Sequence, residues 1–433
     1  MNKEWDVVVV GAGVFGLTTA LELAVQGYAS VTVLDRYVPP VPDGSSVDIS
    51  RVIRFDYADD VYLNMAYEAY QQWSQSPKYK DVFVPAPVVM TSNHSPAGRS
   101  YVQKTTDALD RARLPWARLE SAEETRHLYP TLSGALAGPD FMGYHNQQAG
   151  WADAQKAIAG LRDECIIQGV SFVSGRAGTV IGFDRDASGT IRAGRTLAGT
   201  TVAGDLFILA AGAWSASLVP MHNSTLSTGQ VIAYMRLTPV EMTKYQQLPI
   251  YVNFATGWFN FPPHQDTSLL KIVVHGWGYE RAPNEAEREI LKTQVSMPPL
   301  AVSTRRKNFV PSDGERRLRD GLRELLPELA DRPFEQVAMC WYTDTPTGDF
   351  IMDYHPDYRN LFIAGGGSGH GFKFLPVMGK YTTLALQNAL EPALAQKWRF
   401  RTEYKNVAGG FPGDGSRGGP EKRQLSADER AKL

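Results

Sequence analysis

Three glycines near the N-terminus have the spacing that loops around phosphate groups use. Gly11, Gly13 and Gly16 form a GxGxxG pattern directly after the valine run of residues 7–10. The first glycine permits a tight turn, the second lets the backbone approach a pyrophosphate, and the third allows close helix–strand packing. Asp35 ends the next valine-rich segment, where an acid can accept hydrogen bonds from ribose hydroxyls. The pattern predicts dinucleotide binding by Gly11, Gly13, Val14, Phe15, Gly16, Asp35 and Arg36.

Alternating strands and helices must position this loop. We expect strands over residues 6–10, 31–34, 170–173, 205–210 and 361–364. We expect helices over residues 17–24, 61–73, 153–168 and from 376 to about 390, and a helix opened by a capping box of Ser312 and Glu315. Gly212 and Gly365 follow later strands, which favours an interleaved domain around an elongated cofactor such as FAD over a continuous NAD domain. The pattern indicates an α/β protein.

Composition narrows the class of protein further. The chain has 433 residues, 43% of them hydrophobic and 21% charged, which is an ordinary globular balance. A net charge of −2 gives no field that would attract nucleic acid or an anionic membrane. The uncharged residues 7–21 are too few for the ~20 that cross a bilayer, and no basic segment precedes them. Two cysteines, Cys165 and Cys340, indicate a reducing compartment rather than a disulfide framework.

Three motifs in the C-terminal third resemble one family. Residues 340–346 (CWYTDTP), 353–356 (DYHP) and 367–374 (GSGHGFKF) are similar to motifs of the monomeric sarcosine oxidase family. That family includes L-pipecolate oxidase, L-saccharopine oxidase and the fungal fructosyl amino acid oxidases, or amadoriases. The resemblance runs from Asp6 to about Trp398. It implies an interleaved Rossmann-like FAD-binding domain and a β-rich substrate domain, as in the D-amino acid oxidase-like superfamily.

The resemblance also implies a domain division and a set of cofactor contacts. We expect the FAD-binding domain to comprise residues 1–82, 150–220 and 325–400, the substrate domain 83–149 and 221–324, and a tail 401–433. Cys340 would carry FAD through an 8α-S-cysteinyl bond, since a thiolate is a soft nucleophile. Cys165 is expected to be a core residue. The expected further FAD contacts are Ser50, Arg51, Gly212, Gly369 and Lys373.

Further positions match substrate-site residues of that family. Arg54 and Lys373 would hold a substrate carboxylate, for which an arginine fork and a lysine charge are suited. Lys271, among the apolar residues 269–274, would be the site of oxygen activation, with an exposed strand lysine as the alternative. His275 and Tyr342 would line the pocket, with core packing as the alternative. No metal site is expected.

The activity that follows is oxidation of a secondary amine bearing a carboxylate, such as saccharopine, pipecolate or an N-methyl amino acid, with O2 as acceptor and H2O2 as product. Alternatives are an amadoriase, a specialised-metabolite amine oxidase, a dehydrogenase that uses a partner, or an FAD-binding protein without turnover. Amadoriases usually lack an arginine at the position of Arg54, which favours a free carboxylate. Sarcosine oxidases tend to carry histidines where this chain has Ser45 and Ser46.

The C-terminal tail predicts a location. Residues 408–417 are rich in glycine, and we expect them to be mobile. The last three residues, Ala431, Lys432 and Leu433, resemble the SKL peroxisomal address with alanine in place of serine. We therefore expect recognition by a peroxisomal import receptor, a monomer as in the family, and no nucleic-acid or membrane partner.

Overall fold

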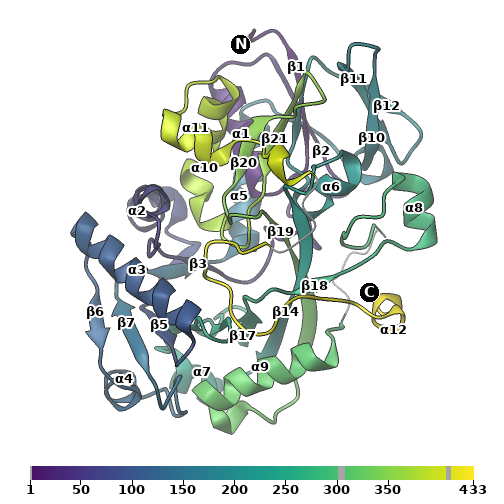
Figure 1. The fold of residues 1–433 in the computed structure, drawn as a ribbon. Helices are drawn as coiled ribbons and strands as arrows, with labels where there is room; N and C mark the ends of the chain where they lie inside the picture. The colour runs from purple at the N-terminus through teal and green to yellow at the C-terminus, as the bar shows by residue number, and fades with distance from the viewer. Residues whose placement is uncertain (1, 301–307, 406–410) are drawn as a thin grey trace.

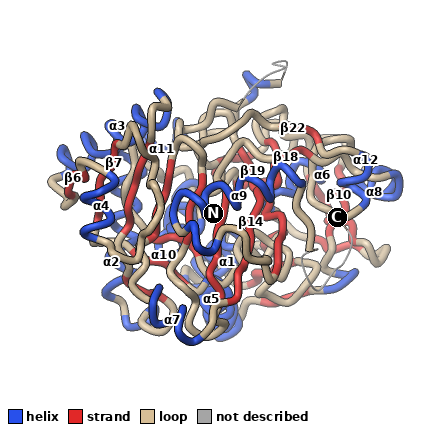
Figure 2. Tube along the Cα trace, turned by 90° about the horizontal axis from the view of Figure 1, so that it is seen from below, coloured by secondary structure: helices blue, strands red, loops and turns tan. Residues whose placement is uncertain are grey.

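The computed structural model describes residues 2–300, 308–405 and 411–433. Two large sheets organise these residues, with the N-terminal strands in the upper half of Figure 1 and β5–β7 at its lower left. No helix among the described residues is both long and apolar enough to span a membrane. Figure 2 shows α2, α3 and α4 gathered at one end of the molecule, with α8 and α12 at the other.

The first sheet carries the predicted dinucleotide loop. Its six strands run in the order β20-β21-β13-β1-β2-β9, and all pairs are parallel except β20 with β21. Val8 of β1 lies between Thr32 of β2 and Phe207 of β13. The strands are β1 (Asp6–Val10), β2 (Ser30–Leu34), β9 (Ser171–Val173), β13 (Leu206–Leu209), β20 (Ile351–Tyr354) and β21 (Leu361–Gly365).

Both faces of this sheet are buried, which explains the continuous valine run of β1. Val7 and Val9 pack in the core with α1 (Val14–Val25), α5 (Ala154–Ile167) and α10 (Leu375–Leu386). Val8 and Val10 face the opposite side, where the small sheet β10 (Val180–Arg185), β11 (Ile191–Thr196) and β12 (Thr201–Ala203) covers them. Alternate residues of a strand point to opposite faces, so a strand covered on both sides needs apolar residues throughout.

The second sheet forms the opposite wall of the molecule. Its strands follow the order β22-β18-β14-β17-β16-β15-β5-β7-β6, and β19 pairs with β14 along nine residues. Leu318, Leu322 and Leu325 of α9 (Ser312–Leu325) pack against it. The strands are β5 (Val88–Ser92), β6 (Ala117–Leu119), β7 (Met142–Asn146), β14 (Leu226–Arg236), β15 (Ile250–Asn253), β16 (Trp258–Asn260), β17 (Leu269–Val274), β18 (Tyr279–Glu280), β19 (Gln336–Asp344) and β22 (Arg423–Gln424).

Smaller elements join the two sheets. A three-stranded sheet of β3 (Arg51–Ile53), β8 (Gly150–Ala152) and β4 (Phe83–Pro85) carries the arginine segment. The remaining helices are α2 (Asp60–Gln75), α3 (Pro96–Ala112), α4 (Ala122–Leu128), α6 (Ser215–Leu218), α7 (Pro239–Tyr245), α8 (Glu285–Leu291), α11 (Pro392–Trp398) and α12 (Ala427–Ala431). Short 3₁₀ turns over Gly212–Trp214 and Phe372–Phe374 border the cavity described below.

The α/β fold class is confirmed, and each expected strand and helix is present within a few residues of its predicted bounds. Two local predictions are wrong. Ser312 is not a capping residue, because Pro311 occupies the N-cap and no side-chain cap bond forms there. The helix from Pro376 ends at Leu386 rather than near residue 390, and a separate helix, α11, follows it.

The prediction of a mobile tail is also wrong where it can be judged. Residues 408–410 lie outside the described residues. From Phe411 onward the tail is ordered and packs on the second sheet, where β22 pairs in parallel with β18. Its glycines permit close packing, since Gly418 forms a bridge with Gly276 and a Cβ at Gly418 would lie 2.3 Å from the amide nitrogen of Gly257.

Candidate active site

A cavity of about 290 Å³ lies between the two sheets. One wall is formed by the residues that follow the carboxyl ends of β1, β2, β13 and β21, and the other by β14, β16, β17 and β19. Ligands of parallel α/β sheets bind in the crevice outside these carboxyl ends. Most of the predicted site residues therefore line one cavity.

The glycine loop forms one end of this cavity. Gly11 has φ +113°, and a Cβ there would lie 2.4 Å from the Ala210 carbonyl oxygen, so no other residue fits. A Cβ at Gly16 would lie 1.8 Å from the Gly11 oxygen, which explains how closely α1 approaches β1. Gly13 is the N-cap of α1 and has no side chain of its own to cap the helix, while the Val14 amide donates to Ser46 Oγ at 2.9 Å. Backbone N–H groups at the start of a helix are suited to bind a pyrophosphate.

Asp35 and Arg36 flank that loop at the end of β2. The Ala12 amide donates a hydrogen bond to Asp35 Oδ2 at 2.7 Å, and burial raises the pKa of Asp35 above its ordinary value. The Arg36 guanidinium lies 4.1 Å from the centroid of the Trp214 ring and pairs with Asp43 at 2.9 Å. Arg36 Nη1 is buried without a hydrogen-bond partner among the described residues. An orphaned donor of this kind is suited to a phosphate or ribose oxygen, so the residues fit the dinucleotide part of FAD.

Cys340 lies in the middle of the cavity wall, on β19. Its thiol is buried, and Arg51 Nη2 donates to Cys340 Sγ at 3.7 Å. The same guanidinium bonds the Ser45 carbonyl oxygen at 2.7 Å and Asp48 Oδ2 at 2.7 Å. The Arg51 guanidinium therefore fixes the position of the sulfur at the cavity wall. Cys165 instead lies in the core against α1, as expected, and burial raises its pKa to about 12.

Lys271 belongs to a buried network that includes an acid missing from the sequence prediction. Its side chain is 2% exposed, so the alternative of an exposed strand lysine is wrong. Lys271 Nζ donates to Asp48 Oδ2 at 2.9 Å and to the Ser50 carbonyl oxygen at 2.7 Å. Burial lowers the pKa of Lys271 to about 7, with Asp48 opposing this shift and Arg51 adding to it. Ser50 thus meets the network through its backbone, outside the cavity lining.

Arg54 and Lys373 line the part of the cavity around Tyr57 and His370. Lys373 Nζ donates to the Tyr57 hydroxyl at 2.8 Å, and Tyr57 bonds His370 Nδ1 at 2.9 Å. His370 Nε2 can only donate to the Gly348 carbonyl oxygen, 2.8 Å away, so Nδ1 accepts from Tyr57. Burial and the charge of Arg54 lower the pKa of Lys373 well below its ordinary value. Arg54 Nη1 is buried without a hydrogen-bond partner in the described part of the chain.

His275 and Tyr342 form a second chain of hydrogen bonds on the opposite wall. His275 Nδ1 lies 3.3 Å from the Tyr342 hydroxyl, and His275 Nε2 lies 3.1 Å from Ser416 Oγ. Ser416 Oγ donates in turn to Asp414 Oδ1 at 2.5 Å. The serine therefore accepts from Nε2–H, and Nδ1 accepts from Tyr342. Burial and the nearby Arg417 lower the pKa of His275 well below its ordinary value, which keeps the ring neutral.

The cavity collects every predicted site residue except Gly16 and Ser50, which support it from behind. Gly212 and Gly369 border it, and a Cβ at Gly369 would lie 2.5 Å from the Tyr342 ring. Sequence reasoning missed one acid beneath the cavity, Asp48, and four residues in its lining, Tyr57, His370, Asp414 and Ser416. Asp48 and Tyr57 adjoin the arginine segment and His370 lies in a quoted motif, so proximity to these motifs was an available signal. Nothing local marked Asp414 or Ser416.

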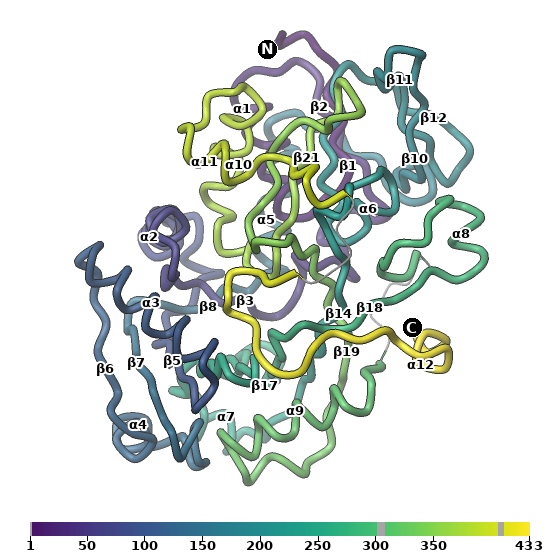
Figure 3. The backbone as a smooth tube through the Cα atoms, viewed as in Figure 1, coloured from purple at the N-terminus to yellow at the C-terminus, as the bar shows by residue number. Residues whose placement is uncertain are grey.

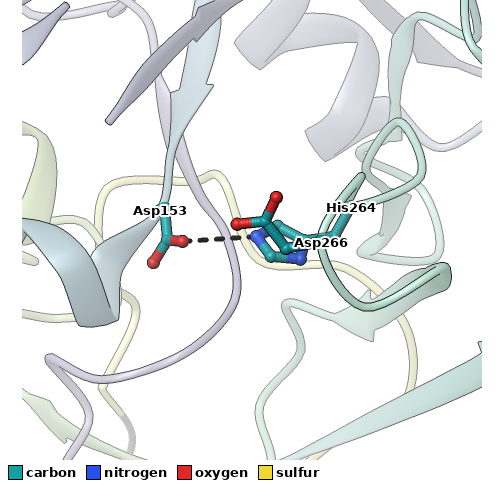
Figure 4. Close-up of side chains that lie close together, drawn as sticks. All are labelled: Asp153, His264 and Asp266. Carbon is teal, nitrogen blue, oxygen red and sulfur yellow. Dashed lines mark hydrogen bonds and ion pairs between the residues drawn. The ribbon is translucent and has the colours of Figure 1, made fainter. Parts of the chain in front are cut away.

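A separate group of acidic and histidine side chains lies outside this cavity. Figure 4 shows Asp153, His264 and Asp266 close together, with His264 Nε2 3.3 Å from Asp153 Oδ2. Lys156 Nζ already pairs with Asp266 at 2.5 Å and with Asp153 at 3.5 Å. The Lys156 ammonium therefore contacts both carboxylates and offsets part of their negative charge. The group links α5 to the loop before β17 and has the contacts of a structural tie.

Comparison with known proteins assigns this arrangement to a family. The profile described as FAD dependent oxidoreductase matches residues 6–384. L-saccharopine oxidase of Schizosaccharomyces pombe is 31% identical over 413 residues, covering 92% of this chain and 94% of that protein. Peroxisomal sarcosine oxidase of Homo sapiens is 28% identical over 397 residues, covering 87% and 90% respectively.

A solved structure gives the same assignment. The fructosamine oxidase Amadoriase II of Aspergillus fumigatus, in complex with FSA, superposes with a TM-score of 0.86 at 28% identity, over 98% of this chain and 96% of that one. The expected resemblance, the fold and the dependence on FAD are thereby confirmed. The site geometry and these comparisons lead to one conclusion: the chain belongs to the family of FAD dependent oxidoreductases.

Proposed function

We propose that this chain is an FAD-dependent oxidase of secondary amines that bear a carboxylate. The class, a flavin-dependent amine oxidase, is supported by the family and by the named oxidases similar to the chain. The carboxylate is supported by one observation: Arg54 and Lys373 both line the cavity, and within the described residues neither forms an ion pair, although the charge of the buried Asp56 acts on both. Two buried cations side by side repel each other, so an anion bound between them is strongly favoured.

In this proposal the protein orients and desolvates the amine. Arg54 and Lys373 hold the carboxylate, which fixes the adjacent C–H bond inside the cavity. Bound FAD would supply the two-electron redox chemistry that links this bond to O2. The CH–NH unit loses two electrons and two protons to become an imine, water then hydrolyses the imine to a carbonyl compound and an amine, and O2 gains two electrons and two protons to become H2O2.

Lys271 acts in this proposal on the oxygen side of the reaction. Its ammonium lies in the buried network with Asp48 and Arg51, close to the Cys340 side of the cavity. Reduction of O2 develops negative charge, and a fixed cation in a site of low dielectric stabilises that charge better than water does. Tyr342 and His275 line the opposite wall and exclude water.

The experiment that tests this function is a screen for peroxide release. Saccharopine, pipecolate, N-methyl amino acids and fructosyl amino acids are offered to the FAD-loaded protein, with the corresponding amides or esters as controls. Oxidation of secondary amines only when the carboxylate is free is the expected result. Flavin reduction without peroxide would identify a dehydrogenase and contradict the oxidase. Preference for fructosyl amino acids would favour the amadoriase alternative, which the similarity to Amadoriase II supports.

We also propose that Cys340 holds FAD through an 8α-S-cysteinyl bond. The place of Cys340 in the cavity lining, with Arg51 Nη2 in contact with its Sγ, supports this bond. Acid-precipitated protein should stay yellow, whereas Cys340→Ala should release its flavin. Cys165→Ala is the matched control, because Cys165 lies in the core and should leave the precipitate yellow. A colourless wild-type precipitate contradicts the bond.

The domain division remains part of the proposal. The six-stranded sheet takes its strands from residues 1–82, 150–220 and 325–400, which supports a discontinuous FAD-binding domain. β14 and β15–β18 come from residues 221–324, which supports the substrate domain. We further propose a monomer, which size-exclusion chromatography with light scattering would test.

We propose a peroxisomal location on the basis of residues 431–433 and of the human relative's name. Lys432 is exposed, while the Leu433 side chain is half-buried against the second-sheet core. Receptor binding therefore requires Leu433 to leave that contact. A fluorescent fusion that ends at Leu433 should enter peroxisomes, and deletion of Leu433 should leave it outside them. Equal distribution of both fusions contradicts the proposal.

A further inference from the structure

The ordered C-terminal segment 411–425 passes along the rim of the cavity. Gly413 donates to the Pro346 carbonyl oxygen at 3.0 Å, and Gly419 donates to the Ala255 carbonyl oxygen at 2.9 Å. Figure 3 shows this yellow segment running alongside β18 before it reaches α12. The segment thereby places side chains from the end of the chain near Arg54 and Lys373. The part of the cavity lined by these two cations is its substrate end.

A buried charge anchors the segment there. Arg417 forms an ion pair with Asp344 and donates to the carbonyl oxygens of Gly276 at 2.9 Å and Ser368 at 3.1 Å. Its guanidinium carbon lies 4.9 Å from the Tyr342 ring centroid. Because Ser368 and Tyr342 line the cavity, these contacts fix Arg417, and the residues just before it, at the cavity.

Asp414 is the carboxylate that this anchoring brings into the cavity lining. Its Oδ1 accepts from the Ser416 amide at 3.0 Å and from Ser416 Oγ at 2.5 Å. Its Oδ2 has no hydrogen-bond partner among the described residues. His370, the two bonds from Ser416 and His275 lower the pKa of Asp414 below its ordinary value, despite the opposing effect of burial.

The other charges of the cavity make this carboxylate distinctive. Within the described residues, the acidic side chains of the lining are Asp35 and Asp414. Asp35 lies at the glycine loop and accepts from Ala12. At the substrate end, Asp414 therefore faces a lining that otherwise carries the cations Arg54 and Lys373, with neither of which it forms an ion pair in this structure. A ligand that satisfies this end of the site needs both an anionic and a cationic group.

We infer that Asp414 is a specificity-determining residue that binds a second, non-reacting ammonium group of the substrate, while Arg54 and Lys373 bind its carboxylate. The inference rests on the proposed oxidation of carboxylate-bearing secondary amines and narrows their class. The substrate is then an amino acid with a secondary amine, a carboxylate near that amine and an ammonium group farther along the molecule. The reacting amine itself has to be neutral to give up a hydride, so it is not the cation that Asp414 holds.

Two probes that differ in one ammonium group test this inference. N6-(carboxymethyl)-L-lysine carries the second ammonium, and 6-(carboxymethylamino)hexanoate lacks it, while both keep the same secondary amine and both carboxylates. Ion-paired hydrogen bonds contribute about 1.5–3 kcal/mol, so the first probe should have a kcat/KM about 10- to 150-fold higher. Sarcosine serves as a third probe with neither chain nor second ammonium.

Two variants locate the preference. Asp414→Asn keeps an acceptor for Ser416 and removes the charge, so the ratio of the two kcat/KM values should fall to about 1 with the hexanoate probe little changed. Ser416→Ala keeps the Asp414 charge and should retain the preference. Asp414→Lys should reverse it. The flavin absorbance of each purified variant verifies that the site is folded and loaded.

The outcomes separate the inference from the function beneath it. Oxidation of all probes at similar kcat/KM, or a preference that survives Asp414→Asn, overturns the role of Asp414 and leaves the oxidase standing. Absence of flavin reduction by sarcosine, both matched probes and the amines of the peroxide screen overturns the proposed function, and the inference with it. A preference lost in Asp414→Asn and kept in Ser416→Ala supports both.

Discussion

The two ends of the cavity are built in different ways. The dinucleotide end consists mainly of backbone from one short stretch, residues 11–16, with Asp35 on the neighbouring strand. The substrate end consists of charged and aromatic side chains from five separate segments, around residues 54, 271, 342, 373 and 414. The first end depends on the absence of side chains, and the second depends on their charges.

This difference explains which residues tolerate change. At the glycine loop, steric limits act through contacts of 1.8–2.4 Å that any Cβ would create. At the substrate end, each side chain has a chemical role that a neighbour partly supports, such as Asp48 between Arg51 and Lys271. We therefore expect all-or-none effects at the first end and graded, chemically selective effects at the second.

The largest effect is expected for Gly16→Ala. The added Cβ would lie 1.8 Å from the Gly11 oxygen, so the loop has to move and the protein should be purified without FAD. Flavin absorbance per protein and thermal unfolding measure this. Gly160→Ala is the control, because no atom lies within 4 Å of its added Cβ, and it should stabilise α5 by up to about 1 kcal/mol. Normal flavin content in Gly16→Ala would contradict the steric argument.

Lys271→Met should slow reaction of the reduced enzyme with O2 by about 10²–10³-fold, as expected for loss of one preorganised charge. Anaerobic reduction by substrate should stay near normal, which stopped-flow absorbance can separate from reoxidation. Asp48 keeps Arg51 as its partner at 2.7 Å, so the variant should fold. The exposed Lys104→Met is the matched control. Slow reduction with normal reoxidation would instead place Lys271 on the substrate side.

Arg54→Gln should raise the substrate KM by about 10- to 150-fold, the equivalent of one charge-assisted hydrogen bond of 1.5–3 kcal/mol. Esterifying the substrate carboxylate should produce a similar loss in the wild type and a much smaller one in the variant. Steady-state kinetics on the acid and its ester measure this double comparison. Equal kcat/KM values for acid and ester in the wild type would contradict the binding of a substrate carboxylate by Arg54.

The smallest effect is a pH dependence of carboxylate binding through Lys373. Its pKa is well below the ordinary value because of burial and Arg54, and a bound carboxylate favours the charged form and raises that pKa. The complex therefore binds more protons than the free protein, and affinity for acetate should fall as pH rises through the Lys373 pKa, by at most about tenfold per pH unit. Titration by flavin absorbance measures this. Lys373→Met should bind weakly at every pH, and a wild-type affinity independent of pH contradicts the assignment.

Much of the fold could be predicted because its signals are local. Local patterns predict the secondary structure and the buried residues of the valine run of β1, the glycine loop and the leucine stripe of α9. The failures were local as well, since Pro311 took the N-cap position expected for Ser312. The prediction for the glycine-rich tail failed for another reason. Its composition favours mobility, but the ion pair between Arg417 and Asp344 of β19 holds it in place.

The sequence by itself determined the cofactor-binding loop and the family, because a loop that works through its backbone requires glycines at fixed spacing. The C-terminal motifs added the predictions for Cys340 and Lys373. Only the tertiary structure decided which charges meet. Asp48 and Lys271 are far apart along the chain yet lie 2.9 Å apart in the fold, and Asp414 reaches the cavity from the last part of the chain. Electrostatic partnership depends on distance and burial in space, and neither is encoded in the spacing of residues along the sequence.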